Sequence, residues 1–319
     1  MASDFPKNKP ENKLEWSERE LIFNISEIFA EANSEVLVGI GDDAAVVARP
    51  EAPVVVTTDM AVEDVHFKVN WSSAKQIGQK VAAANLADIF AMGGKPKFLT
   101  VAMSATGNEK LEWMLDLARG IAHEAHLAGA QVIGGDLARS EKIVISITAI
   151  GECTKPILRS GAQVGDSIYI SKLPGFSAAG LIALQKDVRG ELIDFAISEH
   201  LAPTIDYQIA SQFSADANSL CDISDSMMIQ GAQMADASGV QFIFNGDLLS
   251  KHPDFARLLQ IAERLEVSVF DLVLSGGEDH TFLATGRALK GFEIGKVVAG
   301  SGIRLEHLET PQPGWQHFS

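Results

Sequence analysis

The chain has 319 residues, of which 46% are apolar, and its 26 basic and 42 acidic residues give it a net charge of −16. This length and composition are enough for two domains with full hydrophobic cores, and the negative charge argues against nucleic acid or an anionic membrane as the main partner. A small anionic substrate stays compatible with this charge, because bound divalent cations can invert the local field.

The two cysteines, Cys153 and Cys221, are far apart and lack CxxC spacing, which argues against a zinc knuckle or a disulfide framework. A reducing, cytoplasmic setting is therefore expected. No apolar run approaches the ~18–20 residues needed to span a bilayer. Residues 1–14 are polar, contain proline and lack the apolar core of a signal peptide, so we expect a disordered tail there.

A first domain is predicted over residues 15–154. Apolar residues recur at helical spacing over residues 17–32, and a strand and a turn follow in the sequence VLVGIGDDAAVV. Apolar and β-branched runs predict further strands, while serine-capped and amphipathic segments predict two more helices. These strands are expected at residues 53–60, 98–105, 130–136 and 142–152, and these helices at residues 72–94 and 108–128.

The stretch AAANLADIFAMGG, residues 82–94, is built almost wholly of apolar side chains and carries one carboxylate, Asp88. An ionised carboxylate on such a helix is costly unless it is paired, hydrogen-bonded or bound to a metal. Asn85 lies three residues earlier on the same helical face, so the two form a polar patch that favours metal or ligand contact. The alternative is a carboxylate neutralised by a buried lysine or arginine.

A second domain is predicted over residues 155–319, because a turn, a strand and a glycine-rich loop restart the pattern at ILRSGAQVGDSIYISKLPG. Strands and helices mix there without a strict βαβ rhythm, so two α+β domains fit better than one doubly wound sheet. The expected helices lie around residues 177–185, 203–214 and 227–237, and the expected strands around residues 219–223, 241–244, 280–284 and 294–298.

Acidic side chains recur at or just after strand ends, beside small residues. Each alone is explained by a turn in which the carboxylate bonds its own backbone, but the repetition indicates a shared site. Oxygen ligands without cysteine or histidine favour Mg²⁺ over zinc, and Mg²⁺ held by a few carboxylates also binds substrate phosphates, which predicts a nucleotide substrate. The positions are Asp42, Asp43, Asp59, Asp136, Asp222, Asp225, Glu278 and Asp279, and Asp88 joins them from its helix.

Three glycine-containing stretches, at residues 39–41, 134–135 and 276–277, either bring backbone N–H groups close to phosphates or form tight turns. The sequence contains no GxxxxGK[ST] P-loop and no kinase-type HRD or DFG set. The GFSAAG stretch around Ser177 does not have the spacing of a GxSxG nucleophile elbow.

Taken in chain order, eight short motifs resemble those of the thiamine-monophosphate kinases, a family of ATP-binding proteins related to aminoimidazole ribonucleotide synthetase. The motifs run from about residue 39 to residue 318, and their order is specific although each alone is weak. They are GIGDDAAVV, VVTTDMAVEDVHF, NLADIFAMGGKP, IGGDLARS, RSGAQVGDSIYIS, DISDS, LSGGEDH and GWQHF.

This resemblance implies direct in-line transfer of the ATP γ-phosphoryl group to thiamine monophosphate, and a homodimer whose N-terminal sheets join into a barrel. It implies several Mg²⁺ ions held by Asp43, Thr57, Thr58, Asp59, Asp88, Asp136, Asp222 and Asp225, of which Asp43, Asp88 and Asp225 are also catalytic. It assigns ATP contacts to Gly135, Asp136, Arg159 and Ser224, and thiamine monophosphate contacts to His66, Glu278 and Trp315. From the residues alone, His66 is as well explained by packing, and Trp315 is better explained as a packing anchor.

Four positions depart from the family's motifs: Ser226 and Asp64 stand where glycine is usual, His280 replaces tyrosine, and Ala87 replaces serine. If position 226 requires a positive φ, serine costs roughly 1 kcal/mol there, and Asp64 adds negative charge near the phosphate acceptor. Two alternatives therefore stay open. One is a catalytically drifted nucleotide-binding paralogue that acts as a binding or regulatory dimer, and the other is a related enzyme that forms a phosphorylated intermediate from ATP.

Overall fold

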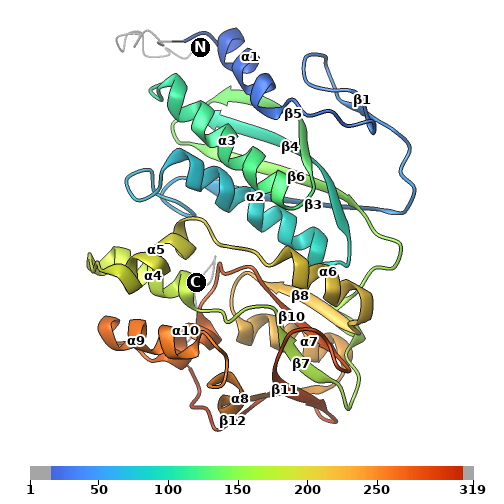
Figure 1. Cartoon of the computed structure of the whole chain (residues 1–319), viewed down its shortest axis with the longest axis vertical. Coiled ribbons are helices and arrows are strands. Elements are labelled where there is room, and N and C mark those ends of the chain that lie inside the picture. Colours follow the sequence, from blue (N-terminus) through green and yellow to red (C-terminus); the bar gives the residue numbers. More distant parts are fainter. Residues whose placement is uncertain (1–15, 312–319) are drawn as a thin grey trace, which may run out of the picture.

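The computed structural model describes residues 16–311, so the expected tail at residues 1–14 and Trp315 lie outside the described residues. Figure 1 shows two sheets, one above the other along the long axis of the molecule. We call residues 16–152 the N-terminal half and residues 153–311 the C-terminal half. The expected boundary near residue 154 falls in the connection between the last strand of the upper sheet and the first helical turn of the lower part.

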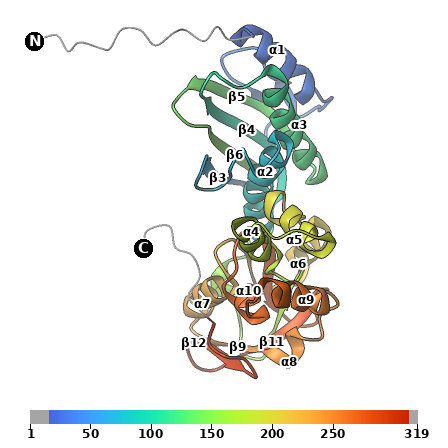
Figure 2. The same ribbon diagram turned by 90° about the vertical axis from the view of Figure 1, so that its left-hand side faces the viewer.

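The N-terminal half contains a four-stranded sheet in the order β3-β6-β4-β5, in which only β4 and β5 are parallel. Three helices lie on one side of this sheet, as Figure 2 shows. Every helix and strand expected in this half is confirmed, with shifted ends. The elements are α1 (Glu18–Phe29), β1 (Val36–Val38), β2 (Val46–Val47), β3 (Val54–Val62), α2 (Ala74–Ala91), β4 (Lys95–Ala105), α3 (Leu111–Leu127), β5 (Gln131–Arg139) and β6 (Val144–Glu152).

The C-terminal half contains a six-stranded sheet in the order β12-β9-β11-β7-β10-β8, antiparallel except between β12 and β9. The mixed α+β class is thereby confirmed. Four helices and the last strand were not expected from the sequence: α5, α8, α9, α10 and β12. The elements are η1 (Arg159–Gly161), β7 (Ser167–Ile170), α4 (Phe176–Lys186), α5 (Glu191–Leu201), α6 (Tyr207–Asp216), β8 (Ser219–Ile223), α7 (Met227–Ser238), β9 (Gln241–Asn245), α8 (Gly246–Leu249), α9 (Phe255–Leu265), α10 (Val269–Ser275), β10 (Thr281–Gly286), β11 (Phe292–Val298) and β12 (Gly302–Glu306).

Helix α2 is apolar on all sides because it is covered on all sides. A capping box formed by Ser73 and Gln76 starts it. Its first three turns pack with α3 and the upper sheet, and a Cβ on Gly78 would overlap the Leu117 carbonyl oxygen, so glycine allows the two helices to touch. Its last turns, including Phe90, pack instead against α6 and the lower sheet. This helix therefore joins the two halves through shared cores.

A polar contact adds to this junction. The hydroxyl of Tyr207 on α6 donates to Oε1 of Glu124 on α3 over 2.6 Å, and its ring stacks on Phe90 at a centroid distance of 5.0 Å. Burial raises the pKa of Glu124 although this hydrogen bond opposes the rise. Within residues 16–311, no helix combines the length and the apolar character that a bilayer span requires.

Candidate active site

A cavity of about 700 Å³ lies between the two halves. Its upper wall comes from β3, from the connection between β3 and α2, and from α2 itself. Its lower wall comes from α4, from the end of α5, and from the loops after β8 and before β10. The acidic and histidine side chains that line it are Asp59, Asp64, His66, Asp88, His200, Asp222, Asp225, Glu278 and His280.

Asp88 points from α2 toward β3. The Thr57 hydroxyl donates to its Oδ2 over 2.7 Å, while Asn85 accepts a hydrogen bond from the backbone N–H of Asp59 over 2.9 Å and so fixes β3 against α2. No lysine or arginine forms an ion pair with Asp88 among the described residues. Burial, and then the negative charges of Asp222 and Asp59, raise the pKa of Asp88 to about 6. The alternative that a buried lysine or arginine neutralises Asp88 is therefore wrong for the described residues.

Asp222 faces Asp88 from the opposite wall, at the end of β8. Its Oδ2 lies 3.1 Å from Nδ1 of His280, and both side chains are almost fully buried. Burial disfavours the charged imidazole, but the hydrogen bond to Asp222 and the surrounding carboxylates outweigh it and raise the pKa of His280. The histidine that departs from the family's motif thus lies within hydrogen-bond distance of one of the acidic side chains, Asp222.

These carboxylates have the chemistry of a cation site without a preformed ligand cage. Burial raises the pKa of Asp59 as well, and Asp222 adds to that rise while His280 and His66 oppose it. No group of three or more histidine, cysteine, aspartate or glutamate side chains within residues 16–311 is arranged to hold a metal ion. Mg²⁺ keeps waters and substrate oxygens among its ligands, so one or two carboxylates are enough to bind each ion. A bound Mg²⁺ would also relieve the repulsion between these neighbouring carboxylates, so the residues present fit this ion.

The two lower loops are locked together by their backbones. The N–H of Glu278 donates to the Ser224 carbonyl over 2.7 Å, and the N–H of His280 donates to the Ile223 carbonyl over 3.1 Å. A Cβ on Gly277 would lie 2.6 Å from the Ser224 carbonyl oxygen and would overlap that of Asp225. Glu278 and His280 themselves have positive φ values of 61° and 46°, which is strain of the kind retained at functional sites.

Glu278 is held by a lysine from the other half. Nζ of Lys80, on α2, lies 2.8 Å from Oε2 of Glu278 and donates to the His200 carbonyl over 3.0 Å. Burial alone would raise the pKa of Glu278, but the charge and hydrogen bond of Lys80 lower it to about 2. Burial and the same lysine lower the pKa of His200 to about 3, so that its ring is neutral beside the Ser177 hydroxyl, 3.1 Å away.

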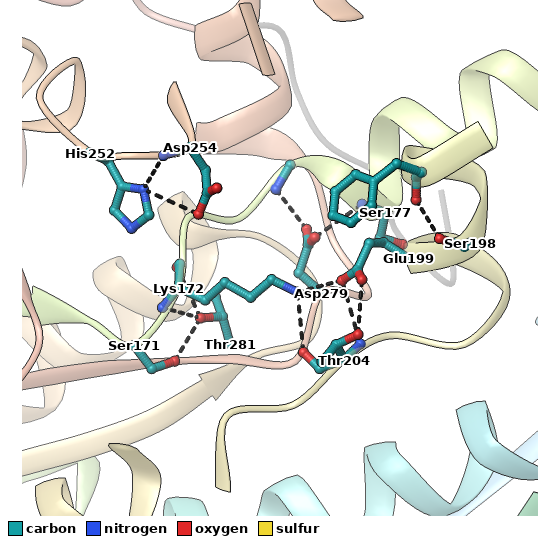
Figure 3. A network of polar contacts seen from close by, with 12 residues as sticks. Ser171, Lys172, Ser177, Ser198, Glu199, Thr204, His252, Asp254, Asp279 and Thr281 are labelled. Carbon is teal, nitrogen blue, oxygen red and sulfur yellow. Dashed lines mark hydrogen bonds and ion pairs between the residues drawn. The ribbon is translucent and has the colours of Figure 1, made fainter. Parts of the chain in front are cut away.

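Asp279 is hydrogen-bonded to the start of α4, one of the elements of the lower wall. It accepts hydrogen bonds from the backbone N–H groups of Gly175 and Ser177, at 2.8 and 3.0 Å, and so covers the first turn of α4. Figure 3 shows it beside the network in which Lys172 bonds Glu199. Burial raises the pKa of Asp279 to about 6 although these hydrogen bonds oppose the rise. Since Asp279 bonds the backbone of α4 and does not line the cavity, it supports the wall and does not face a ligand.

The rest of the cavity wall is largely apolar. It includes Trp71, Leu181 and Ile182, and the Lys68 ammonium lies 4.3 Å from the centroid of the Trp71 ring. His66 also lines the cavity, and its Nδ1 accepts the Val62 N–H over 3.0 Å. Acidic and apolar side chains thus line the same cavity, which suits a ligand that carries both phosphate groups and a ring.

Several predicted site residues lie elsewhere in this single chain. Asp43 is exposed, and Gly135 and Asp136 are on β5, at the opposite edge of the sheet from β3. Gly135 and Asp136 border a second, mainly apolar cavity of about 360 Å³ under α1 and α3, together with Asp42. The stretch at residues 134–135 is strand, not a turn. A Cβ on Gly135 would overlap a backbone carbonyl of β4, so glycine there serves strand packing.

Two further residues also lie apart from the cavity. The Thr58 hydroxyl donates to the Ile147 carbonyl on the neighbouring strand over 3.0 Å. Arg159 in η1 donates to Gln233 on α7 over 2.5 Å. Ser224 and Asp225, by contrast, are brought to the cavity together, and Gln230 of α7 donates to both side chains.

The departures from the family's motifs have local explanations. Ser226 has φ −174°, an extended value, and its hydroxyl accepts the Ile229 N–H at the start of α7; the expected strain at this position is therefore wrong. Asp64 has φ 66°, which explains why glycine suits that position, and Lys142 offsets its charge at 3.0 Å. Ala87 is fully buried in the core shared by the two halves.

Lys80, Trp71, His200 and Ser177 line the cavity and were not singled out from the sequence. Lys80 carried a usable signal. It is a charged residue on an apolar helix, and at eight residues before Asp88 it lies about 80° from that carboxylate around the helix, whereas Asn85, five residues on, lies about 140° away. His200 and Ser177 gave no such signal, because they meet only through the tertiary fold.

The chain is similar to known proteins in sequence and in fold. Residues 41–153 match the family described as AIR synthase related protein, N-terminal domain. The thiamine-monophosphate kinase of Corynebacterium glutamicum is 36% identical over 299 residues, covering 87% of this chain and 88% of the relative. That of Mycobacterium tuberculosis is also 36% identical, covering 89% and 86%.

Solved structures give the same result. The thiamine-monophosphate kinase of Stenotrophomonas maltophilia has a TM-score of 0.78 and 29% identity, covering 89% of this chain and 95% of that one. A structure described as AaThiL complexed with AMPPCP and TMP also has a TM-score of 0.78 and 29% identity, covering 94% and 97%.

Proposed function

Because the chain belongs to the thiamine-monophosphate kinase family, we propose that it transfers the γ-phosphoryl group of ATP to thiamine monophosphate, giving thiamine diphosphate and ADP. One observation carries the proposal: Asp59, Asp88 and Asp222, from three distant segments, line the same cavity as Glu278. A relative of this fold was solved with AMPPCP and TMP bound. The apolar side chains of the cavity suit a ring, and its acidic side chains suit cation-bound phosphates.

The acidic residues of the cavity would hold Mg²⁺. Asp59, Asp88, Asp222 and Asp225 offer the oxygen ligands that this ion prefers, and Thr57 orients Asp88. When bound, the ions supply neutralisation and in-line alignment of the phosphates of donor and acceptor. Asp88 and Asp225 are our proposed catalytic side chains within the cavity.

The chain's own groups position the reactants. Direct phosphoryl transfer requires little other chemistry from the protein, because it depends mainly on positioning and on neutralisation of charge. The acceptor phosphate oxygen is already ionised at neutral pH, so no general base is needed. Ser224 and the loop locked to Glu278 provide a rigid lower wall, while Asn85 and Thr57 fix the upper wall. His66 and Glu278 are the proposed contacts to thiamine monophosphate, and Trp315 stays a prediction outside the described residues.

A homodimer would explain the residues that lie apart. The sheet face turned away from α2 and α3 exposes Val54, Val56 and Met60, at 48, 60 and 58% of their surface. Such an apolar face favours a partner, and a second copy matches the implied barrel. If β5 of one copy adjoins β3 of the other, the second copy's counterparts of Asp43, Gly135 and Asp136 approach this cavity and complete the ATP site.

The test of function is incubation with ATP, MgCl₂ and thiamine monophosphate, followed by chromatography of thiamine phosphates and of ADP. We expect equal amounts of thiamine diphosphate and ADP, and no product after the metal is removed with EDTA. ATP binding without product would favour the drifted paralogue. ADP formation without thiamine diphosphate would favour an enzyme that phosphorylates another acceptor.

The dimer gives a separate prediction. Val56→Asp places a charge on the exposed face at β3, the edge strand proposed to adjoin the second copy, so we expect this variant to sediment as a monomer at micromolar concentration while the unaltered chain sediments as a dimer. Val164→Asp is the matched control, because Val164 is 56% exposed in the turn before β7. A monomeric unaltered chain would refute the proposed barrel.

A further inference from the structure

Lys80 crosses from one half of the molecule to the other at the cavity wall. Its helix belongs to the N-terminal half, whereas both of its partners, the Glu278 carboxylate and the His200 carbonyl, belong to the C-terminal half. The lysine side chain is only 9% exposed. The carbonyl is in the last turn of α5, where the helix dipole favours a cation.

The contacts leave one side of Glu278 available. Lys80 lies 2.8 Å from Oε2, and Nδ1 of His200 lies 3.9 Å from the same atom. Oε1 has no hydrogen-bond partner within the described residues, and the side chain is 38% exposed in the cavity. The backbone of Glu278 is pinned to Ser224, so the direction in which Oε1 points depends on the lysine.

We propose that Lys80 is a positioning residue that holds Glu278 across the junction so that its remaining oxygen accepts a hydrogen bond from an amino group on the acceptor's ring. This inference rests on the proposed function, because thiamine monophosphate carries such a group on its pyrimidine. A carboxylate that is fixed and ionised accepts more strongly than a mobile one. The neutral ring of His200, which is hydrogen-bonded to Ser177, also lies 3.9 Å from Oε2.

A purely structural lysine would behave differently. It would stabilise the fold through the ion pair but would leave discrimination between acceptors unchanged. A positioning lysine sets the preference for a ring with an amino group over a ring with oxygen at the same place. If Oε1 of Glu278 points elsewhere, only the hydrogen bond from the amino group is weakened. Hydrogen bonds to charged groups contribute about 1.5–3 kcal/mol, or ~10–150-fold in affinity.

The test compares thiamine monophosphate with oxythiamine monophosphate, in which oxygen replaces the ring amine. Binding of each to the full chain is measured by calorimetry with ADP and MgCl₂, alongside turnover with ATP. We expect the unaltered chain to prefer the amino compound by ~10–150-fold, and Lys80→Met and Glu278→Gln to reduce that preference to about threefold or less. The double variant should lose no more preference than either single one.

Two further variants separate positioning from stability. Lys80→Arg keeps the charge with a different donor geometry, so it should fold and show an intermediate preference even if Lys80→Met does not fold. Lys172→Met is the matched control, because Lys172 also pairs a buried glutamate, Glu199, but neither residue lines the cavity. It should lower the melting temperature and leave the preference unchanged.

The results distinguish this inference from the proposed function. An unchanged preference in Lys80→Met and Lys80→Arg would overturn the positioning role even if thiamine diphosphate is formed. Binding of thiamine monophosphate with lysine-dependent preference, but without product, would overturn the kinase activity and retain the positioning role. Absence of both binding and product would overturn both.

Discussion

Asp88→Asn is expected to lower turnover of ATP and thiamine monophosphate by about a thousandfold or more while the metal-free protein becomes more resistant to heat. The two effects have one cause. A carboxylate that neutralises a bound cation is worth several kcal/mol in the transition state, and each ~1.4 kcal/mol is tenfold in rate. Without a cation, the same charge is buried and repelled by Asp222 and Asp59.

The sign of the stability effect follows from the pKa. An acid whose pKa rises from 3.8 to about 6 on folding makes the folded state less stable as pH increases through that interval, and the penalty remains above it. Calorimetric melting at pH 8 with EDTA should therefore show a higher melting temperature for Asp88→Asn, and added Mg²⁺ with ATP should stabilise the unaltered chain far more.

The control is Asp116→Asn, since Asp116 lies on the exposed face of α3 beside Arg119 and should change neither quantity. A lower melting temperature for Asp88→Asn together with retained turnover would contradict our account of this carboxylate.

Gly277→Ala is expected to reduce turnover by about a hundredfold or more and to lower the free energy of unfolding by ~1–3 kcal/mol. The added methyl group would overlap the carbonyl oxygens of Asp225 and Ser224, so the two loops that carry the lower wall must separate. Overpacking of this kind costs about that amount. Displacement of Glu278 and Asp225 by an ångström is enough to lose a hundredfold in rate.

Gly239→Ala provides the comparison. Gly239 ends α7 with φ +65° and no atom within 4 Å of an added Cβ, so alanine should cost about 1 kcal/mol there without affecting turnover. Urea unfolding and steady-state kinetics of the two variants make the comparison. Equal turnover in both would show that the locked loops do not set the geometry of the site.

Local patterns made much of this fold predictable. The capped start of α2 and the strands on either side of it are confirmed because their signals are short-range and consistent with their tertiary environment. Helices α5, α9 and α10 were missed, although α9 has apolar residues at helical spacing. Helices α5 and α9 begin without a side-chain cap, and α10 has only seven residues, so their local signals are weak. Boundaries shifted by several residues where tertiary packing extends an element, as in β4.

The sequence indicated which residue types form the site, but only partly which of these residues lie together in the fold. Asp59, Asp88, Asp222 and Asp225 do meet in one cavity, as expected. Asp136 does not join them in the single chain, because the order of strands in a sheet is set by long-range pairing that no local pattern encodes, and β5 lies across the sheet from β3. The lysine that holds Glu278 was missed for a similar reason, since its partner is 198 positions further along the chain.

Carboxylates from separate segments converge between the two halves, where we expect them to bind divalent cations and phosphates. The most direct measurement is anomalous X-ray diffraction from crystals grown with Mn²⁺, a non-hydrolysable ATP analogue and thiamine monophosphate. We expect Mn²⁺ peaks at coordination distance from Asp59, Asp88 and Asp222, with phosphate oxygens among the ligands. Bound nucleotide with no Mn²⁺ peak at these carboxylates would contradict the account.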